Sequence, residues 1–369
     1  MRVLVAGDFC PQLRVKGLFA NNDFASVLSE VRNLTDVVDY SIVNLECPII
    51  QGYEKPIDKV GRNLHCSEKG IKALKWAGFD CVTLANNHFY DYGDDGVTNT
   101  IKVCAEHGID TVGGGVNLAD ADVTLFKRFG NHTLAIINCC EHEFSIATET
   151  TCGSNPLNPI HQFYKIREAK KQADYVLVIV HGGNEHYQFP SPRMVETYRF
   201  FIDAGADVVV NHHQHCFSGY ELYNQKPIFY GLGNFCFDNG AKGGIWNEGF
   251  LVELSFSEEI GFRILPYKQC GTTPSITFLK SASKGFFDCL HSINCTISNL
   301  VDLQTRYNEY LENNDVEPIF EPYTSKILIG LKRRHLLPSF LTKKKKRILL
   351  AYIQCESHIV KVIHALRKP

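Results

Sequence analysis

Short apolar runs that end in polar clusters recur along this chain, and few folds accommodate that pattern. The apolar runs are typical of β-strands and are Arg2–Ala6, Tyr40–Val43, Cys81–Ala85, Tyr175–Val180, Asp207–Val210 and Pro227–Tyr230. The polar clusters, most of them directly after a run, are Gly7-Asp8, Asn44-Leu45-Glu46, Asn86-Asn87-His88, His181–Glu185, His212–His215 and Gly231–Phe235. Ligands of α/β folds bind beyond the carboxyl ends of the strands. The recurrence therefore predicts a functional site at such an edge.

The fold class follows from how β-like and helical patterns alternate as far as about Cys270. Helical patterns are Ser67–Ala77, Asp94–His107, His161–Gln172 and Pro192–Ala204, and further strand patterns are His132–Cys139, Phe250–Phe256 and Phe262–Pro266. Strands that alternate with helices predict an α/β layered domain. The β-rich closing stretch predicts a mixed or second sheet, and 369 residues are enough for a substantial core.

The character of the chain changes after Cys270, so we predict two domains, 1–270 and 271–369. Phe286–Asn313 is expected to be mostly helical, and Ile348–Leu366 to be an amphipathic helix. From Lys326 onward the chain is rich in lysine and arginine, and Glu356 is its single acidic residue. Such a basic extension indicates an acidic partner or a membrane surface, or else a solvated appendage packed on its own acidic domain.

Composition narrows the class of protein. A net charge of −2 gives no electrostatic argument for nucleic acid as a partner. No apolar run approaches the roughly 20 residues that span a bilayer, and the first strand begins at Arg2, so we expect no signal peptide. Fourteen cysteines without a CxxC pair indicate reduced thiols and disfavour a thiolate zinc site. We therefore expect a cytoplasmic protein, with peripheral membrane contact as an open alternative.

The polar clusters together supply the ligand types of a divalent metal centre. Carboxylate, amide and imidazole ligands suit Mn, Fe or Zn. The predicted ligands are Asp8, Glu46, Asn87, His181, His213 and His215. Two metals about 4 Å apart need a bridging carboxylate, for which Glu46 is the best placed candidate. Asp8 and His215 would complete one metal, and Asn87, His181 and His213 the other.

Two further residues are candidates for catalysis. His88 directly follows Asn87, so we expect it to point away from the metal and to contact the substrate anion or protonate the leaving group. Glu185 lies four residues after His181 and either orients an imidazole or is a simple turn carboxylate. On an extended segment, His213 and His215 share one side, which leaves His212 as an ordinary histidine.

Each cluster taken alone also has an ordinary interpretation. Gly7-Asp8 is a common turn, Glu46 is able to cap the segment at Pro48, and asparagine at a strand end often makes an Asx turn. Three histidines in His212–His215 are harder to explain in that way, and the ordered set predicts a metal site. The histidines that match no such spacing are expected to be surface or structural residues: His65, His107, His132, His142, His161 and His186.

The order of the clusters resembles the bacterial capsule-synthesis CapA family, which is named for poly-γ-glutamate capsule production. The matching blocks are Gly7-Asp8, Asn44–Glu46, Leu84–His88 with Asp91-Tyr92-Gly93, His181–Glu185, Ala204–Asp207 running into His212–His215, and Tyr230–Phe235 with Phe237-Asp238. The resemblance covers about residues 1–256. The family is similar to a branch of the calcineurin-like metallophosphoesterases. The resemblance therefore implies a four-layer α/β/β/α sandwich with a two-metal site between loops.

Three positions depart from the phosphoesterase pattern. Its first motif, Asp-x-His, here has Cys10 in place of the histidine, and its bridging aspartate is here Glu46. The block Gly-His-His-Pro-His here begins with Asn211 and has Gln214 in place of the proline. The resemblance implies two divalent ions (Mn, Fe or Zn), and the loss of the histidine at Cys10 weakens one of the two sites.

Two functions from different classes are consistent with these features. The first is a metal-dependent, phosphoesterase-like hydrolase that acts in biosynthesis of a capsule or other extracellular polymer. Its substrate would be an anionic small molecule or polymer. The alternative is a non-catalytic accessory protein of capsule or exopolysaccharide assembly, which would use the same pocket to bind an anionic polymer or partner.

Overall fold

The computed structural model describes residues 1–59, 61–279, 284–313, 325–334, 336, 342–354, 358, 361–363 and 366. The chain forms two compact units, Met1–Tyr307 and Asn308–Pro369. The division therefore lies later than the predicted boundary at residue 270.

The first sheet is mixed, with strand order β16-β15-β14-β1-β2-β3-β4, and β13 also pairs with β1. Its strands are β1 (Arg2–Phe9), β2 (Tyr40–Leu45), β3 (Cys81–Thr83), β4 (Asp110–Val112), β13 (Asn234–Cys236), β14 (Glu248–Ser255), β15 (Gly261–Gln269) and β16 (Ile276–Phe278). The strands β1 to β4 are parallel, whereas β14 to β16 are antiparallel to their neighbours. The expectation of a mixed closing region is confirmed.

The second sheet has the order β11-β12-β10-β9-β7-β6. Its strands are β6 (Leu125–Phe129), β7 (His132–Cys140), β9 (Tyr175–His181), β10 (Val208–His212), β11 (Tyr220–Tyr223) and β12 (Lys226–Phe229). Its four central strands are parallel, and β6 and β11 are antiparallel at the two edges. A short ribbon of β5 (Gly114–Gly115) and β8 (Gly153–Ser154) lies apart from both sheets.

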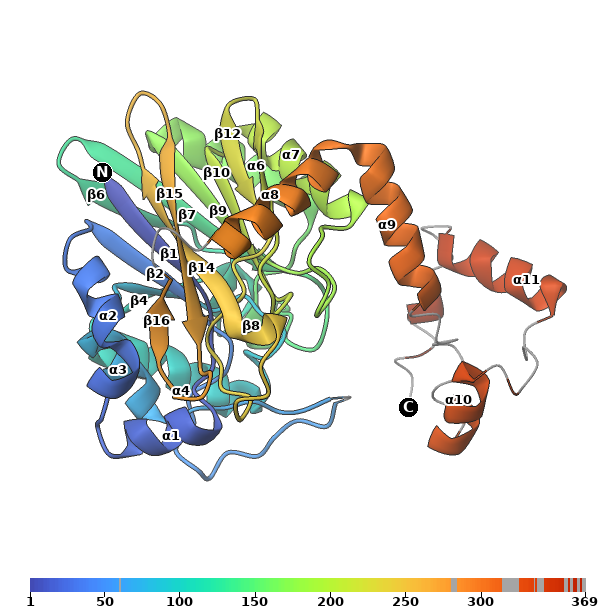
Figure 1. Ribbon diagram of the computed structural model, residues 1–369, viewed down its shortest axis with the longest axis horizontal. Coiled ribbons are helices and arrows are strands. Elements are labelled where there is room, and N and C mark those ends of the chain that lie inside the picture. Colours follow the sequence, from blue (N-terminus) through green and yellow to red (C-terminus); the bar gives the residue numbers. More distant parts are fainter. Residues whose placement is uncertain are drawn as a thin grey trace. The chain divides into compact units, whose positions relative to one another are not determined.

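Helices cover the outer faces of the two sheets (Figure 1). The first sheet carries α1 (Leu13–Ala20), α2 (Ala25–Thr35), α3 (Glu68–Trp76) and α4 (Gly93–Glu106), and the second carries α6 (Pro159–Gln172) and α7 (Pro192–Ala204), while α5 (Leu118–Ala121) is a single turn. Alternation along β1 separates two apolar cores, because Val3 and Val5 face the second sheet whereas Leu4 and Ala6 face α1 to α4. The predicted four-layer α/β/β/α sandwich is confirmed.

Local sequence signals explain where α7 begins and ends. The Oγ of Ser191 accepts a hydrogen bond from the Met194 amide at 3.2 Å, and Pro192 occupies the first turn, where its missing N–H is harmless. Gly205 ends the helix with a φ of 121°. The other three predicted helices are also present, as α3, α4 and α6.

Beyond β16, the C-terminal extension is mostly helical where it is described. It contains α8 (Lys284–Ser298), α9 (Leu300–Asn313), α10 (Lys326–Arg333) and α11 (Lys343–Gln354), so the expectation for Phe286–Asn313 is confirmed. The expected helix Ile348–Leu366 overlaps α11, and most of its remainder lies outside the described residues. Among the described residues, no helix is long and apolar enough to cross a bilayer.

The helix α8 belongs to the first unit. Its Phe286 ring lies 4.7 Å from the ring of Phe217, measured between centroids, and Asn294 accepts a hydrogen bond from the Tyr220 amide at 2.8 Å. These contacts anchor the helix beside β11, so part of the predicted C-terminal domain is packed on the sandwich.

The junction of β1 and β13 leaves no room for a side chain at Gly7. A Cβ atom there would lie 1.9 Å from the carbonyl oxygen of Gly233, next to the Asp8 amide that bonds to the same oxygen. We expect Gly7→Ala to lower the free energy of unfolding, measured by urea denaturation, by about 1–3 kcal/mol, the range for overpacked cores.

Gly17 in α1 is the matched control, because a Cβ atom there meets nothing within 4 Å. Gly17→Ala should raise stability by about 0.5–1 kcal/mol through helix propensity alone. Equal effects of the two substitutions would show that the β1–β13 junction is not tightly packed.

Candidate metal centre

The carboxyl ends of strands from both sheets meet at one site. Asp8 lies near the end of β1, where its register with β2 shifts, and Glu46 follows β2 directly. In the second sheet, His181 is the last residue of β9, and His213 follows β10. Two groups of buried ligand atoms result, each within 4.8 Å of one another: Glu46, His181 and His213, and Asp8, Glu46 and His215.

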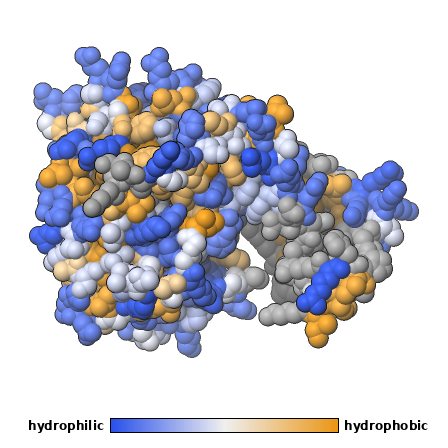
Figure 2. All heavy atoms as spheres, in the orientation of Figure 1, coloured by the Kyte–Doolittle hydropathy of each residue, from blue (hydrophilic) through white to orange (hydrophobic). Residues whose placement is uncertain are grey.

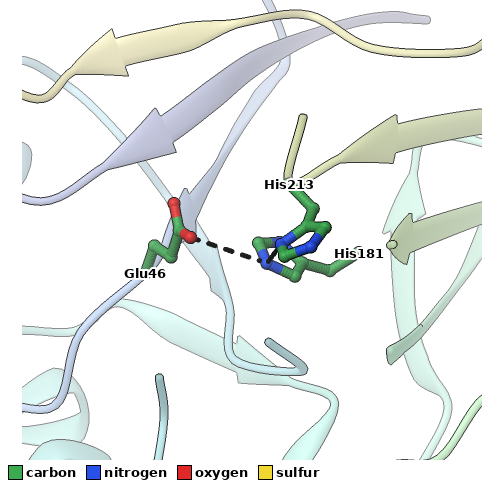
Figure 3. A group of neighbouring side chains, drawn as sticks. All are labelled: Glu46, His181 and His213. Carbon is green, nitrogen blue, oxygen red and sulfur yellow. Dashed lines mark hydrogen bonds and ion pairs between the residues drawn. The ribbon is translucent and has the colours of Figure 1, made fainter. Parts of the chain in front are cut away.

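Glu46 is common to both groups and is fully buried. Its Oε1 lies 3.6 Å from Nε2 of His181 and 3.6 Å from Nε2 of His215. The carboxylate and the imidazoles of the first group face one another from opposite sheets (Figure 3). Among the described residues, neither Glu46 oxygen has a hydrogen-bond partner.

A divalent cation fits this arrangement. A buried carboxylate without partners is strongly destabilising. Atoms that share one ion through bonds of about 2.0–2.2 Å lie roughly 3–3.5 Å apart, close to the separations at Glu46. The Glu46 carboxylate is thus one of the groups that would hold such an ion, and its role as a bridge stays a prediction.

The first group gains a fourth donor from Asn87. Its Oδ1 lies 3.0 Å from Nε2 of His181, and the same nitrogen lies 3.0 Å from Nδ1 of His213. With Glu46, these atoms converge from two sheets on one small volume. All the ligands predicted for this metal are therefore brought together.

The second group is held by amide side chains. Asp8 accepts a hydrogen bond from Nδ2 of Asn44 at 2.7 Å and another from the His213 amide at 3.2 Å. Nδ1 of His215 lies 3.0 Å from Oδ1 of Asn234, so its Nε2 is the nitrogen that faces Glu46. Cys10 belongs to neither group of the described residues, and its sulfur instead accepts a bond from Gln12 at 3.2 Å.

Burial disfavours the charged form of every carboxylate and imidazole in the two groups. It raises the pKa of Asp8 to about 7, against the hydrogen bonds from Asn44 and the His213 amide. Burial, and then the charge of Asp8, raises the pKa of Glu46 well above its usual value. Burial also lowers the pKa of His181 and His215 well below the usual range, which keeps their imidazoles neutral, as metal ligands must be.

His88 is held by a buried acid from its own turn. Its Nδ1 lies 2.7 Å from Oδ2 of Asp91, which also accepts the Leu64 amide at 2.6 Å, and Asp91 pairs with the buried ammonium of Lys59. The Lys59 nitrogen lies 3.2 Å from the same Nδ1, but an ammonium group only donates, so Asp91 is the acceptor for Nδ1–H. Nε2 of His88 is therefore the nitrogen left for a substrate.

Glu185 is exposed and acts on the site through its charge. Burial lowers the pKa of His213, and the negative charge of Glu185 opposes that effect. Its predicted role in orienting an imidazole stays a prediction.

The route of His213 and His215 into the site differs from the predicted one. The strand β10 ends at His212, and the backbone then turns, with φ of 93° at His213 and 54° at His215. Both side chains do reach the site, but from a loop rather than by alternation on an extended segment. Such conformations are costly for residues other than glycine and often mark functional sites.

The structure adds residues that the sequence did not assign. Glu143, from a loop without a readable pattern, lies 3.6 Å from Nε2 of His213 and accepts a bond from Asn87 at 3.1 Å. His186, expected to be a surface or structural residue, is exposed, with its ring centroid 6.1 Å from that of His215. Asn44 and Asn234 were present in the polar clusters, where their strand-end position was the available signal.

Comparison with known proteins matches residues 2–239 to the family described as "Bacterial capsule synthesis protein PGA_cap". The capsule biosynthesis protein CapA of Bacillus anthracis is 38% identical over 248 residues, which cover 65% of this chain and 60% of that protein. The PGA biosynthesis protein CapA of Bacillus subtilis is 34% identical over 220 residues, which cover 58% of this chain and 57% of that protein. The matched part thus spans about 60% of the first relative's length.

Solved structures were compared as well. A phosphatase from Mycoplasma pneumoniae aligns with a TM-score of 0.46 and 15% sequence identity, over 74% of this chain and 95% of that one.

Loss of the Glu46 charge should remove bound metal. We expect about two Mn, Fe or Zn ions per wild-type chain by elemental analysis after purification without chelator, and fewer than one for Glu46→Gln. Because metal stabilises only the folded state, chelator should lower the melting temperature of the wild type and leave that of Glu46→Gln nearly unchanged.

The control for this experiment is Glu54→Gln. Glu54 is also buried, but its carboxylate accepts backbone N–H bonds from Gln51, Gly52 and Tyr53 instead of facing imidazoles. Its metal content should match the wild type. Equal metal in all three proteins would rule out Glu46 as a bridging ligand.

Proposed function

This chain belongs to the bacterial capsule synthesis protein family, and on that premise we propose that it is a metal-dependent hydrolase of phosphoesters that acts in capsule or extracellular polymer biosynthesis. The observation that carries the proposal is the Glu46 carboxylate, buried without a hydrogen-bond partner among the described residues and equidistant from His181 and His215. A structural carboxylate would be paired within the protein, whereas this one would gain its partner from a bound cation.

The predicted ligands divide between two ions. Asp8, Glu46 and His215 would hold one, and Glu46, Asn87, His181 and His213 would hold the other. When bound, such a pair stabilises charge on a phosphoryl oxygen and supplies a water of lowered pKa.

The charge of the ligand set favours an anionic substrate. Asp8 and Glu46 are its two carboxylates, and the other four ligands are neutral imidazoles and one amide. Two divalent ions therefore leave a net positive charge at the bottom of the site. A phosphate ester is an anionic group that such a centre would attract and orient.

His88 is the residue we assign to the leaving group. The bond from its Nδ1 to Asp91 fixes the ring, and the Lys59–Asp91 ion pair holds that carboxylate in place. Nε2 would hold the proton that passes to the departing oxygen, or would bind a phosphoryl oxygen. Glu185, at the exposed rim, would act through its field on His213.

Substitution of any single predicted metal ligand should lower the rate of phosphoester hydrolysis. With Mn and bis(p-nitrophenyl) phosphate, Asp8→Asn and His213→Ala should each lower kcat/KM by about 100-fold or more, because each removes a ligand from one ion. His107→Ala is the control, since His107 pairs with Glu68 at the surface, and its activity should match the wild type.

Unchanged activity in both ligand variants would exclude this centre as the source of hydrolysis. A protein that binds two metals but hydrolyses no phosphoester would instead support the accessory function, in which the same site binds an anionic polymer.

The basic second unit, Asn308–Pro369, supports a further candidate function, contact with an anionic membrane surface. The first five residues of α11, Lys343 to Arg347, are basic and exposed, and Ile348, Leu350 and Ile353 on the same helix are about half exposed. Hydrophilic and hydrophobic side chains of this unit both reach the surface (Figure 2). This combination suits a helix that lies in a lipid interface.

Vesicle binding tests that candidate function. Changing Lys343, Lys344, Lys345 and Lys346 to Gln should weaken binding of the full chain to phosphatidylglycerol vesicles by about 100-fold or more, at roughly 1 kcal/mol per charge. The control changes four exposed lysines of the first unit to Gln: Lys16, Lys55, Lys102 and Lys171. An equal loss of vesicle binding in both variants would contradict a membrane role. So would a chain that binds an acidic glycan such as alginate but not the vesicles.

A further inference from the structure

A hollow of about 410 Å³ opens beside the metal centre. Its lining comes from the segment after β9, from the start of α7, from the residue after β7 and from α9: Gly183, Asn184, Ser191, Pro192, Arg193, Glu141, Gln304 and Tyr307. Glu141 joins it to the centre, because its amide donates to the His181 carbonyl at 3.0 Å and its Oε2 accepts the Gly183 amide at 3.1 Å. A group bound there would lie next to the metal ligands.

The charges of the lining balance. Arg193 and Glu141 form an ion pair at 3.5 Å, and the remaining side chains are amides, hydroxyls and a proline. Glu141 keeps about a third of its side chain exposed, so a carboxylate bound in the hollow would meet a like charge. The lining therefore suits a neutral polar group better than a stretch of polyanion.

The arrangement of polar and aromatic groups points to a particular neutral group. Asn184 and Gln304 carry side-chain amides, and Ser191 and Tyr307 carry hydroxyls, and each of these groups is by its chemistry both a donor and an acceptor. The Tyr307 ring is also paired with Tyr187, at a centroid distance of 6.1 Å, and supplies an apolar face. A sugar ring has this composition, with hydroxyls around its rim and C–H groups on one face.

We propose that the hollow binds the sugar ring of a phosphorylated saccharide whose phosphate lies at the metal centre. The volume is within the about 300–1,000 Å³ of small-molecule sites and suits one or two rings. The inference rests on the proposed phosphoesterase function and names its substrate class. In the reaction, the bond between phosphorus and the sugar oxygen breaks, water supplies the new oxygen on phosphorus, and a proton goes to the sugar oxygen.

Paired substrates test this assignment on the full, metal-loaded chain. Tyr307→Ala and Gln304→Ala should each lower kcat/KM for glucose 1-phosphate by about tenfold and leave glycerol 2-phosphate within about twofold, because only the first substrate has a ring. Thr305→Ala, exposed on the same helix and outside the lining, should change neither value. Equal losses on both substrates, or none on glucose 1-phosphate, would overturn the inference and leave the phosphoesterase function standing.

A binding measurement without catalysis distinguishes the proposed sugar site from the proposed phosphoesterase function. Saturation-transfer NMR on chelator-treated protein should show contact with methyl α-D-glucopyranoside that Tyr307→Ala removes. Such contact in a protein that hydrolyses no phosphoester would support the sugar site and refute the hydrolase. If saturation were transferred to a diglutamate peptide and not to the glucoside, the assignment of a sugar would be overturned.

Discussion

One buried carboxylate joins the two sheets at their functional edge. Glu46 emerges from the end of β2 in the first sheet, and its Oε1 faces imidazoles delivered by the second. Left without a partner it would oppose folding, since a buried unpaired charge is among the most destabilising features a core can hold. A divalent cation held there would remove that penalty and link the sheets. The site, as well as the apolar core, therefore requires the two sheets to meet at the edges where their parallel strands end.

Neutral amides then position the ligands without adding charge. Nδ2 of Asn44 donates to Asp8, while its Oδ1 accepts from the Thr83 hydroxyl at 3.1 Å, so the amide cannot rotate freely. Asn234 holds His215 in a similar way, through its Oδ1 to the ring and its Nδ2 to the His215 carbonyl. Carboxylates in these two places would have added two negative charges beside Asp8 and Glu46. The choice of amides thus keeps the negative charge of the site to its two carboxylates.

The residues that gather at the site were predictable because residue type and strand-end position are both local properties of the sequence. All six predicted ligands lie at the site, and His88 lies beside Asn87 with its ring fixed by Asp91. Glu143 and Lys59 were not predictable, because they reach the site from loops whose paths depend on tertiary packing. The turn at His213 was missed for the same reason, since alternation assumes an extended backbone that β10 does not continue.

Where each helix begins and ends also depends in part on local sequence and in part on tertiary packing. Helix α7 carries its own cap and stop, whereas α1 has eight residues, includes Gly17 and lacks a side-chain cap bond, so packing on the first sheet must hold it. The predicted boundary at 270 marked a change in composition, but burial decides where a unit ends. The residues of α8 at helical spacing are buried: Phe286, Leu290, Ile293 and Ile297. That stripe holds α8 to the sandwich, and α9 follows it, so one wall of the hollow beside the metal centre depends on residues beyond the family match.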